Sequence, residues 1–158
     1  MANTEIFGDD ELELQLAKLA KPEMAKRIVK AGAQPVADEM RKRLRNLPED
    51  KFRRLGKDEI FVGVPDKQKK DLLDSMGIAP ADIDRNGNAN TKVGFHGYGS
   101  YPTKKYPKGV PNQLLARAIE SGSSVRKKTP FIRPAINHSK EKSVEAMQNE
   151  YNQIIEEG

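Results

Sequence analysis

The stretch Lys128-Thr129-Pro130-Phe131-Ile132-Arg133-Pro134-Ala135 decides how the rest of the chain is arranged. Pro130 keeps the residue before it out of the helical region, and Pro134 suits the first turn of a helix because its missing N–H would have no partner there. The sequence therefore predicts Phe131–Arg133 as a short extended hinge before a C-terminal helix. Large apolar side chains are costly to leave in water, so we expect this chain's core or a neighbouring subunit to cover the hinge.

Predicted helices lie on both sides of the hinge. Asn112 suits the cap of a helix over residues 113–121, and Gly122 can leave that helix in a left-handed conformation. After the hinge, a helix is predicted over residues 135–156, which at about 1.5 Å per residue is roughly 30 Å long. An apolar stripe on this helix predicts a face packed on a sheet. The stripe consists of Ile136, Val144, Met147, Tyr151 and Ile154.

The N-terminal part of the chain has a helical pattern. Residues 1–8 carry no periodic signal and are expected to be loose, whereas residues 9–46 are predicted to be helical, with Asp9 as the cap of a first helix. Pro22 suits the first turn of a second helix. Because Pro35 cannot donate a hydrogen bond within that second helix, we expect a kink or a break there.

Residues 58–99 have the features of short strands and a hairpin. The β-branched and aromatic run Ile60–Val64 predicts a strand, which Pro65 ends. Asp66 is a candidate cap for a short helix that Gly77 closes.

Two antiparallel strands, Ile78–Ile83 and Asn90–Phe95, are predicted around Asn86-Gly87, a dipeptide suited to a tight turn. The residues from Asp82 onward also imitate the start of a calcium-binding loop, in which carboxylates and amides alternate before a glycine. The twelfth position of such a loop needs a bidentate Glu, and here it holds Val93. The pattern therefore favours a hairpin turn over a calcium site.

A surface loop rich in Tyr, Pro and Gly is predicted over residues 100–111. Glycine and proline favour turns and irregular backbone, and such loops run over protein surfaces. Tyr98, Tyr101 and Tyr106 are therefore candidate residues for contacts with a partner.

Together these elements predict an α+β fold in a single domain over residues 1–158, with N-terminal helices, a small, mostly antiparallel β-sheet and a long C-terminal helix packed on the sheet. Residues 112–158 supply the short helix, the hinge and the C-terminal helix. Charged residues make up 32% of the chain and hydrophobic residues 36%, against about 25% charged in typical domains. This balance predicts a thin core, which suits a subunit that gains stability from assembly.

The composition argues against several kinds of site. The chain has no cysteine, which excludes disulfides and thiolate metal ligands. His96 and His138 lack metal-ligand spacing, and no local signature joins His96 to a nucleophile such as Ser75 or Ser100. We therefore expect no catalytic residue, no metal or other cofactor, and no enzyme activity. No apolar run approaches the ~18 residues of a membrane span, so no membrane partner is expected.

The net charge of +5 raises the question of nucleic acid as a partner. Basic residues occur in short runs, and acidic residues are interspersed through the predicted helices. This pattern favours a solvated charged surface, with a dedicated track for phosphates as the alternative.

Residues on both sides of the hinge form a candidate interface. Glu120 and Arg133 are candidates for an ion pair within a subunit or across subunits. Phe131 and Ile132 fill either this chain's own core or a pocket of a neighbouring subunit. With the loop tyrosines, the candidate interface residues are Glu120, Phe131, Ile132, Arg133, Tyr98, Tyr101 and Tyr106.

The order of these motifs resembles the phage tail-component family, whose members sit at the neck of tailed phages as head–tail joining or tail-completion proteins. The resemblance lies in an alanine-containing apolar segment, Glu-Ser-Gly-Ser from Glu120, a variable loop, Pro-Phe-Ile-Arg-Pro-Ala from Pro130, and a long C-terminal helix. Upstream, Leu-Leu-Asp-Ser-Met-Gly-Ile from Leu72 and Val-Gly-Phe-His-Gly-Tyr from Val93 match a leucine–serine turn and a Val-Gly strand of the family. The likeness covers residues 66–145.

The resemblance implies a structural virion protein that is assembled in the host cytoplasm and located in the phage neck. It implies a homo-oligomeric ring, a hexamer matching tail symmetry, between the head connector and the tail tube. The implied partners are other neck or connector proteins, the tail-tube or tail terminator protein, and the genomic DNA that passes through the lumen. The alternative function is that of a small basic nucleic-acid-binding protein without a virion role.

Overall fold

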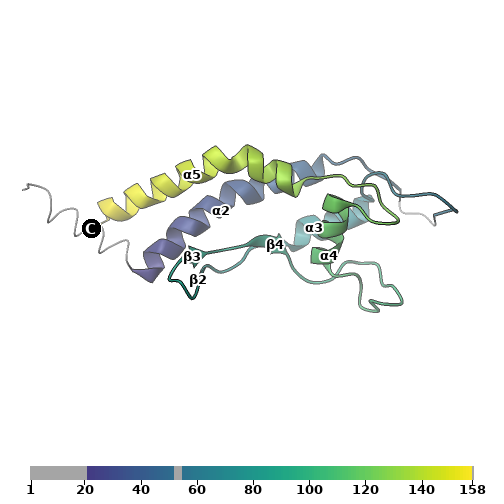
Figure 1. The fold of residues 1–158 in the computed structure, drawn as a ribbon, viewed down its shortest axis with the longest axis horizontal. Coiled ribbons are helices and arrows are strands. Elements are labelled where there is room, and N and C mark those ends of the chain that lie inside the picture. The colour runs from purple at the N-terminus through teal and green to yellow at the C-terminus, as the bar shows by residue number, and fades with distance from the viewer. Residues whose placement is uncertain (1–20, 52–54, 158) are drawn as a thin grey trace, which may run out of the picture.

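The computed structural model describes residues 21–51 and 55–157, and over these residues the fold is α+β. Two long helices, α2 (Pro22–Arg45) and α5 (Ile132–Glu156), lie side by side along the length of the molecule (Figure 1). The strands lie on the other side of α2 from α5, and the short helices α3 (Asp66–Ser75) and α4 (Asn112–Ser121) lie at one end. The predicted fold class is therefore confirmed. The loose residues 1–8 and the predicted first helix lie outside the described residues.

Helix α2 begins at Pro22, as predicted, and runs to Arg45 with Pro35 inside it, so of the kink or break predicted at Pro35 the break does not occur. The cause is tertiary packing, which supplies most of the stability of helices in proteins. Three residues before the proline, Gly32 is buried against the side chain of Met147 in α5. The Ser143 hydroxyl of α5 also donates a hydrogen bond to the Gly32 carbonyl oxygen at 2.7 Å. Helix α5 thus supports α2 beside the position where proline weakens it.

Helix α5 begins at Ile132, three residues earlier than predicted, so only Phe131 and the residues just before it remain as the extended hinge. Its buried face also differs from the predicted stripe. Ala135, Ser139 and Ile154 are buried, whereas the side chains of Ile136 and Val144 are 42% and 67% exposed. Ile154 keeps its predicted place in the buried face and Met147 packs on Gly32 of α2, whereas Ile136 and Val144 of the predicted stripe point outward.

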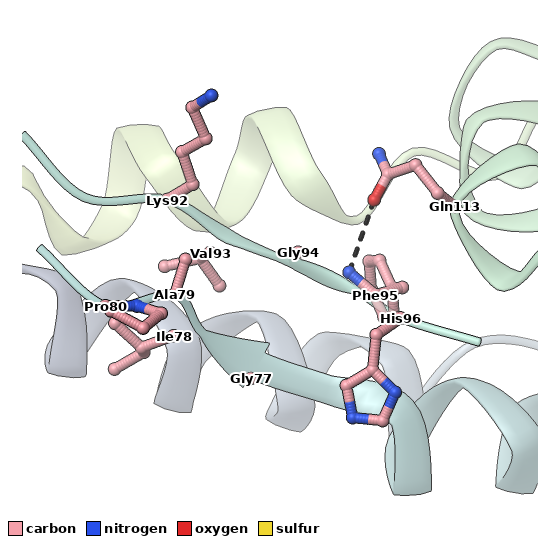
Figure 2. Close-up of a pocket in the computed structure, with 10 residues that line it drawn as sticks. All are labelled: Gly77, Ile78, Ala79, Pro80, Lys92, Val93, Gly94, Phe95, His96 and Gln113. Carbon is pink, nitrogen blue, oxygen red and sulfur yellow. Dashed lines mark hydrogen bonds between the residues drawn. The ribbon is translucent and has the colours of Figure 1, made fainter. Parts of the chain in front are cut away.

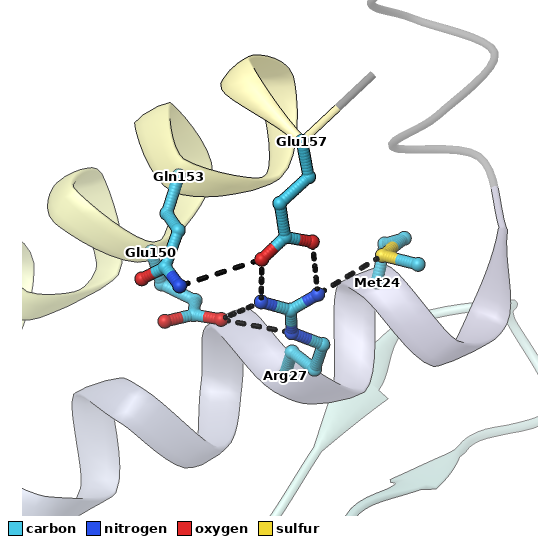
Figure 3. A network of polar contacts seen from close by, with 5 residues as sticks. All are labelled: Met24, Arg27, Glu150, Gln153 and Glu157. Atoms are coloured by element: carbon cyan, nitrogen blue, oxygen red, sulfur yellow. Dashed lines mark hydrogen bonds and ion pairs between the residues drawn. The ribbon is translucent and has the colours of Figure 1, made fainter.

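The far end of the two-helix pair is held by a cluster of charges (Figure 3). The guanidinium of Arg27 in α2 donates to both carboxylate oxygens of Glu157, at 2.9 and 3.0 Å, and to Glu150 at 2.9 Å. These hydrogen bonds to charged acceptors raise the pKa of Arg27 above its usual range and lower the pKa of Glu157. Bidentate geometry of this kind fixes orientation as well as adding energy. Arg27, Glu150 and Glu157, which we call the clamp, therefore set the register of α5 on α2.

Two predictions for the middle of the chain are wrong in detail. Ile60–Val64 is not a strand; Phe61 forms a single parallel bridge with Arg126, and Val64 forms one with Glu49. Asp66 is the first residue of α3 but does not cap it, because the capping position is held by Pro65.

Gly77 does not close α3, because the helix passes directly into strand β1 (Met76–Ile78). Gly77 pairs there with Gly94 of strand β4.

The predicted antiparallel hairpin is present, in two parts. β1 pairs with β4 (Val93–Phe95), and β2 (Asp82–Ile83) pairs with β3 (Ala89–Asn90). The strands are interrupted around Pro80, which has no N–H for a ladder hydrogen bond. All four strands contact α2, so the hairpin forms the layer beneath that helix.

The hairpin turn uses the carboxylate that a calcium site would need. Asp84 and Asn88 close a three-residue loop through the Asp84 N–H and the Asn88 carbonyl oxygen at 2.9 Å, and Gly87 has a φ of 82°. The Asp84 carboxylate accepts the N–H groups of Asn86 and Asn88 at 2.8 and 2.9 Å. Among the described residues, no group of three or more His, Cys, Asp or Glu side chains is placed to hold a metal ion.

The core lies where α2, α3, α4, β4 and the start of α5 meet. Its largest fully buried side chains include Phe131, Leu44, Leu72 and Ile119. The Phe131 ring packs edge-on against Phe95 of β4, with centroids 6.1 Å apart, so the residue directly before α5 connects this helix to the sheet. None of the helices in the described part of the chain is long and apolar enough to span a membrane.

The clamp gives a prediction for pH. The folded-state pKa of Glu157 is lower than its usual value of 4.5, so its contribution to stability is present above that value and is lost as the pH falls through the folded-state pKa. Glu157→Gln should therefore destabilise the protein at about pH 7 and show a smaller further loss than the wild type at about pH 3. Denaturant melts at both pH values measure this difference.

The matched control is Glu156→Gln at the neighbouring exposed residue, which forms no ion pair with any other described residue. It should follow the wild type at both pH values. Equal acid losses in the wild type and Glu157→Gln would contradict the role assigned to the clamp.

Candidate assembly interface

The start of α5 is capped by a carboxylate from another helix. Glu120, in the last turn of α4, accepts the backbone N–H groups of Phe131, Ile132 and Arg133 at 2.7, 2.8 and 2.9 Å. The first N–H groups of a helix have no partner within the helix, and the helix dipole favours negative charge there. Glu120 therefore joins the end of α4 to the start of α5.

Within the subunit, this cap takes the place of the ion pair considered between Glu120 and Arg133. Glu120 contacts Arg133 through the backbone N–H, and among the described residues no acidic side chain forms an ion pair with the Arg133 guanidinium. The carboxylate oxygens are already occupied by the helix start, which explains the difference. The Arg133 side chain is exposed, so its charge is available to another molecule.

The two apolar hinge residues belong to this chain's own core. Phe131 is 0% exposed, and Ile132 is half-buried and packs against the same cluster. The sequence left open whether Phe131 fills this chain's own core or a pocket of a neighbouring subunit. In the structure it fills this chain's own core. Phe131 anchors α5 and leaves the residues after it to form a surface.

Arg126 was missed by the sequence reasoning, because it stands in a short basic run that suggests a solvated surface. It is buried, donates to the Gly63 carbonyl oxygen and to Gln68 Oε1, both at 2.7 Å, and lies 5.3 Å from the Phe61 ring centre. Burial lowers the pKa of Arg126, and the charge of Asp50 opposes that shift. This side chain ties the loop before the hinge to the segment before α3, and no spacing in the sequence distinguishes it from its basic neighbours.

A groove of about 470 Å³ lies over the capped helix start. The exposed cations Lys128 and Arg133 are on its walls, and the half-buried Glu120 is part of its lining. Its further lining residues are Ser121, Pro130, Pro134 and Asn137. The backbone beneath the groove is fixed by the cap and by two prolines, so this surface is preorganised for a partner.

The groove continues onto the outward face of α5. Arg133, Ile136, Lys140 and Val144 recur at spacings of three and four, which places them on one side of the helix. All four are exposed. We call this set the outer α5 face; it combines two cations with two apolar side chains.

The tyrosine loop is at the other end of α4. Tyr98 is 61% exposed and bridges to Pro111 just before α4, whereas Glu120 lies in the last turn of this 10-residue helix, about 15 Å away. Lys67 Nζ lies 5.0 Å from the Tyr101 ring centre, and Lys105 Nζ lies 5.6 Å from that of Tyr106. The structure therefore does not bring the tyrosines and the hinge residues into one site.

Asn112 does not cap α4 as predicted. Pro111 holds the capping position, and Asn112 is buried in the first turn, where its Nδ2 donates to the His96 carbonyl oxygen at 3.0 Å. Its backbone N–H donates to the Gly97 carbonyl oxygen at 3.0 Å. Asn112 thus fixes the chain leaving β4 to the start of α4. At the other end of that helix, Gly122 has the predicted positive φ, 80°.

A second groove, of about 560 Å³, follows the β1–β4 ribbon (Figure 2). Gly77 and Gly94 pair across the ribbon and expose bare backbone, and Gln113 accepts the Phe95 N–H at 3.2 Å. His96 lies at the edge of this groove (Figure 2).

Neither candidate nucleophile is hydrogen bonded to the His96 imidazole. Ser75 Oγ donates to the Leu72 carbonyl oxygen, and Ser100 Oγ donates to Asp71. These three residues therefore do not form a nucleophile–base pair.

The cap gives a prediction for stability. Glu120→Ala removes the acceptor of three N–H groups and should lower the free energy of unfolding by about 1–3 kcal/mol, while Glu120→Gln, which keeps one acceptor oxygen, should lose less. Thermal and denaturant melts measure both. Glu141→Ala, at an exposed position of α5, is the control and should stay within about 0.5 kcal/mol of the wild type. A Glu120→Ala variant as stable as this control would refute the cap.

Comparison of the chain with protein-family models, with curated proteins and with solved structures found no match in any of the three.

Proposed function

We propose that this protein is a structural subunit of the neck of a tailed phage, which acts in head–tail joining or tail completion by forming a homo-oligomeric ring. The proposal starts from the resemblance of residues 66–145 to the phage tail-component family. The observation that carries it is the groove over the capped hinge, because the Pro-Phe-Ile-Arg-Pro-Ala motif builds both its rigid floor and its exposed cation.

The chemistry of this surface supports assembly through it. Arg133 and Lys128 offer charges without an internal acidic partner among the described residues, and the adjacent outer α5 face adds Ile136 and Val144. A neighbouring subunit that supplies an acidic side chain and covers Ile136 and Val144 would gain both an ion pair and the burial of apolar surface. Because Phe131 and the cap already fix the backbone, little ordering entropy is lost on binding.

In this proposal the ring is a hexamer that matches tail symmetry, and it lies between the head connector and the tail tube of the virion. Its other partners are neck or connector proteins and the tail-tube or tail terminator protein. Assembly takes place in the host cytoplasm. The contribution of the chain is interface complementarity, and no catalytic step is assigned to it.

A pair of substitutions tests whether Phe131 stabilises the fold while Arg133 serves the interface. Phe131→Ala opens a cavity in the core and should cost about 3–5 kcal/mol, a large part of the ~5–15 kcal/mol that stabilises a typical domain. Arg133→Ala should leave the melting temperature of the isolated subunit nearly unchanged but prevent assembly. Native mass spectrometry of each variant, alone and mixed with connector or tail-tube proteins, measures the assembly.

Lys142→Ala, an exposed cation of α5 outside the outer α5 face, is the control for loss of charge and should assemble as the wild type does. An Arg133→Ala subunit that forms complete rings would remove the interface role given to this residue. A wild-type chain that stays monomeric with every partner would remove the proposed function itself.

A further inference from the structure

The positive charge of the chain is concentrated in one segment. Residues 85–119 contain no Asp or Glu and six basic residues, so this segment carries +6 while the whole chain carries +5, which leaves −1 for all the rest. The six side chains are Arg85, Lys92, Lys104, Lys105, Lys108 and Arg117, and all are exposed. We call residues 85–119 the acid-free segment. The short basic runs in the sequence alone do not reveal that all the charges of this segment are positive.

The acid-free segment follows one side of the molecule. It runs from the hairpin turn through β3 and β4 to the Tyr-rich loop and α4, along the side of α2 that faces away from α5 (Figure 1). Helix α5, with Glu141, Glu145 and Glu150, lies on the opposite side. The acid-free segment and the outer α5 face thus lie on different sides of α2.

The densest positive charge is in the loop between β4 and α4. The backbone groups of Thr103 and Tyr106 hydrogen bond to each other in both directions, at 2.9 and 3.1 Å, so Lys104 and Lys105 stand at the tip of a closed turn. Lys108 follows two residues later, and Lys67 of α3 joins the group through its contact with Tyr101. We call Lys67, Lys104, Lys105 and Lys108 the loop cluster.

Nearby carboxylates do not neutralise this charge. Within the described residues, no acidic side chain forms an ion pair with any cation of the loop cluster. The nearest carboxylate joined to the loop, Asp71, accepts the N–H and the hydroxyl of Ser100 at 2.8 and 2.7 Å. Asp71 therefore positions the loop, and the lysines remain free to attract an anion.

We propose that the acid-free segment binds the phosphate backbone of duplex DNA, with the loop cluster as the main contact. Exposed lysines of one sign that follow one side of a protein provide the sequence-independent term of DNA binding. The expected binding is independent of base sequence, because the contacts are to phosphates.

The tyrosines favour duplex DNA over single strands. Single-stranded nucleic acids are held by bases stacked on aromatic rings, but lysine side chains lie over Tyr101 and Tyr106. An anionic membrane is disfavoured because stable binding there needs apolar side chains that insert. Of the large apolar side chains exposed in the described chain, only Tyr98 and Leu114 belong to this segment.

This inference goes beyond the proposed ring and does not rest on it. The charge distribution belongs to a single chain, so the subunit should bind DNA before or without assembly. The Arg133→Ala variant, which is expected to abolish assembly, should bind DNA as the wild type does. Failure of the ring and failure of DNA binding are therefore distinguishable.

The test is fluorescence anisotropy of a labelled short DNA duplex of arbitrary sequence, titrated with the protein at several salt concentrations. The wild type should bind with an affinity that falls steeply as salt rises. Replacing Lys104, Lys105 and Lys108 together by Gln should weaken binding at low salt and reduce the slope of log affinity against log salt by about three, roughly one for each phosphate that is no longer neutralised.

The matched control replaces three exposed lysines of the two long helices, Lys30, Lys42 and Lys142, by Gln. It removes the same charge and should leave the slope close to that of the wild type. The proposal is overturned by absent binding at low salt, by equal slope changes in both triple variants, or by tighter binding to a single strand. Binding to phosphatidylserine vesicles but not to the duplex would also overturn it.

Discussion

The fold depends on three hydrogen bonds from the start of α5 to one carboxylate. Glu120 holds the N–H groups of residues 131–133, and so fixes where the last helix begins and in which direction it leaves. Gly122, with its positive φ, lets the chain turn out of α4, and the buried Arg126 anchors the loop that follows to the segment before α3. With these contacts in place, Phe131 enters the core and α5 extends along α2.

The position of α5 then determines how α2 and the two sides of the molecule are arranged. Its Met147 packs on Gly32 of α2, and the Ser143 hydroxyl supports α2 next to Pro35. The hairpin covers the other side of α2, so the molecule acquires two different sides. One carries the outer α5 face and the groove over the hinge, and the other carries the acid-free segment. The two surfaces are separate as a consequence of topology, because each side is built from a different part of the chain.

Much of this fold could be predicted from the sequence. The α+β class, the start of α2 at Pro22, the hairpin around Gly87 and the stop at Gly122 each follow from local stereochemistry, which a single residue type sets. The errors have a common cause, namely contacts between distant segments. Pro35 stays helical because of α5, and Val144 points outward because Ala135, Ser139 and Ile154 form the buried face of α5. Glu120 caps a helix 11 residues away along the chain. The burial of Arg126 depends on Gly63 and Gln68, which no periodicity connects to it.

The distribution of apolar and charged contacts also bears on how such a chain would act within an assembly. The core is gathered at the end where α3, α4 and β4 meet the start of α5, whereas Arg27 and two glutamates hold the far end of the helix pair. Surface ion pairs contribute little on average and weaken with salt, so the far end has less to stabilise it than the hinge end. A partner that binds only the folded state adds its own free energy of binding to the stability of that state. A surface beside the hinge lies on the best-packed part of the molecule. Binding there therefore costs little free energy for ordering the chain, and a docking surface requires this property.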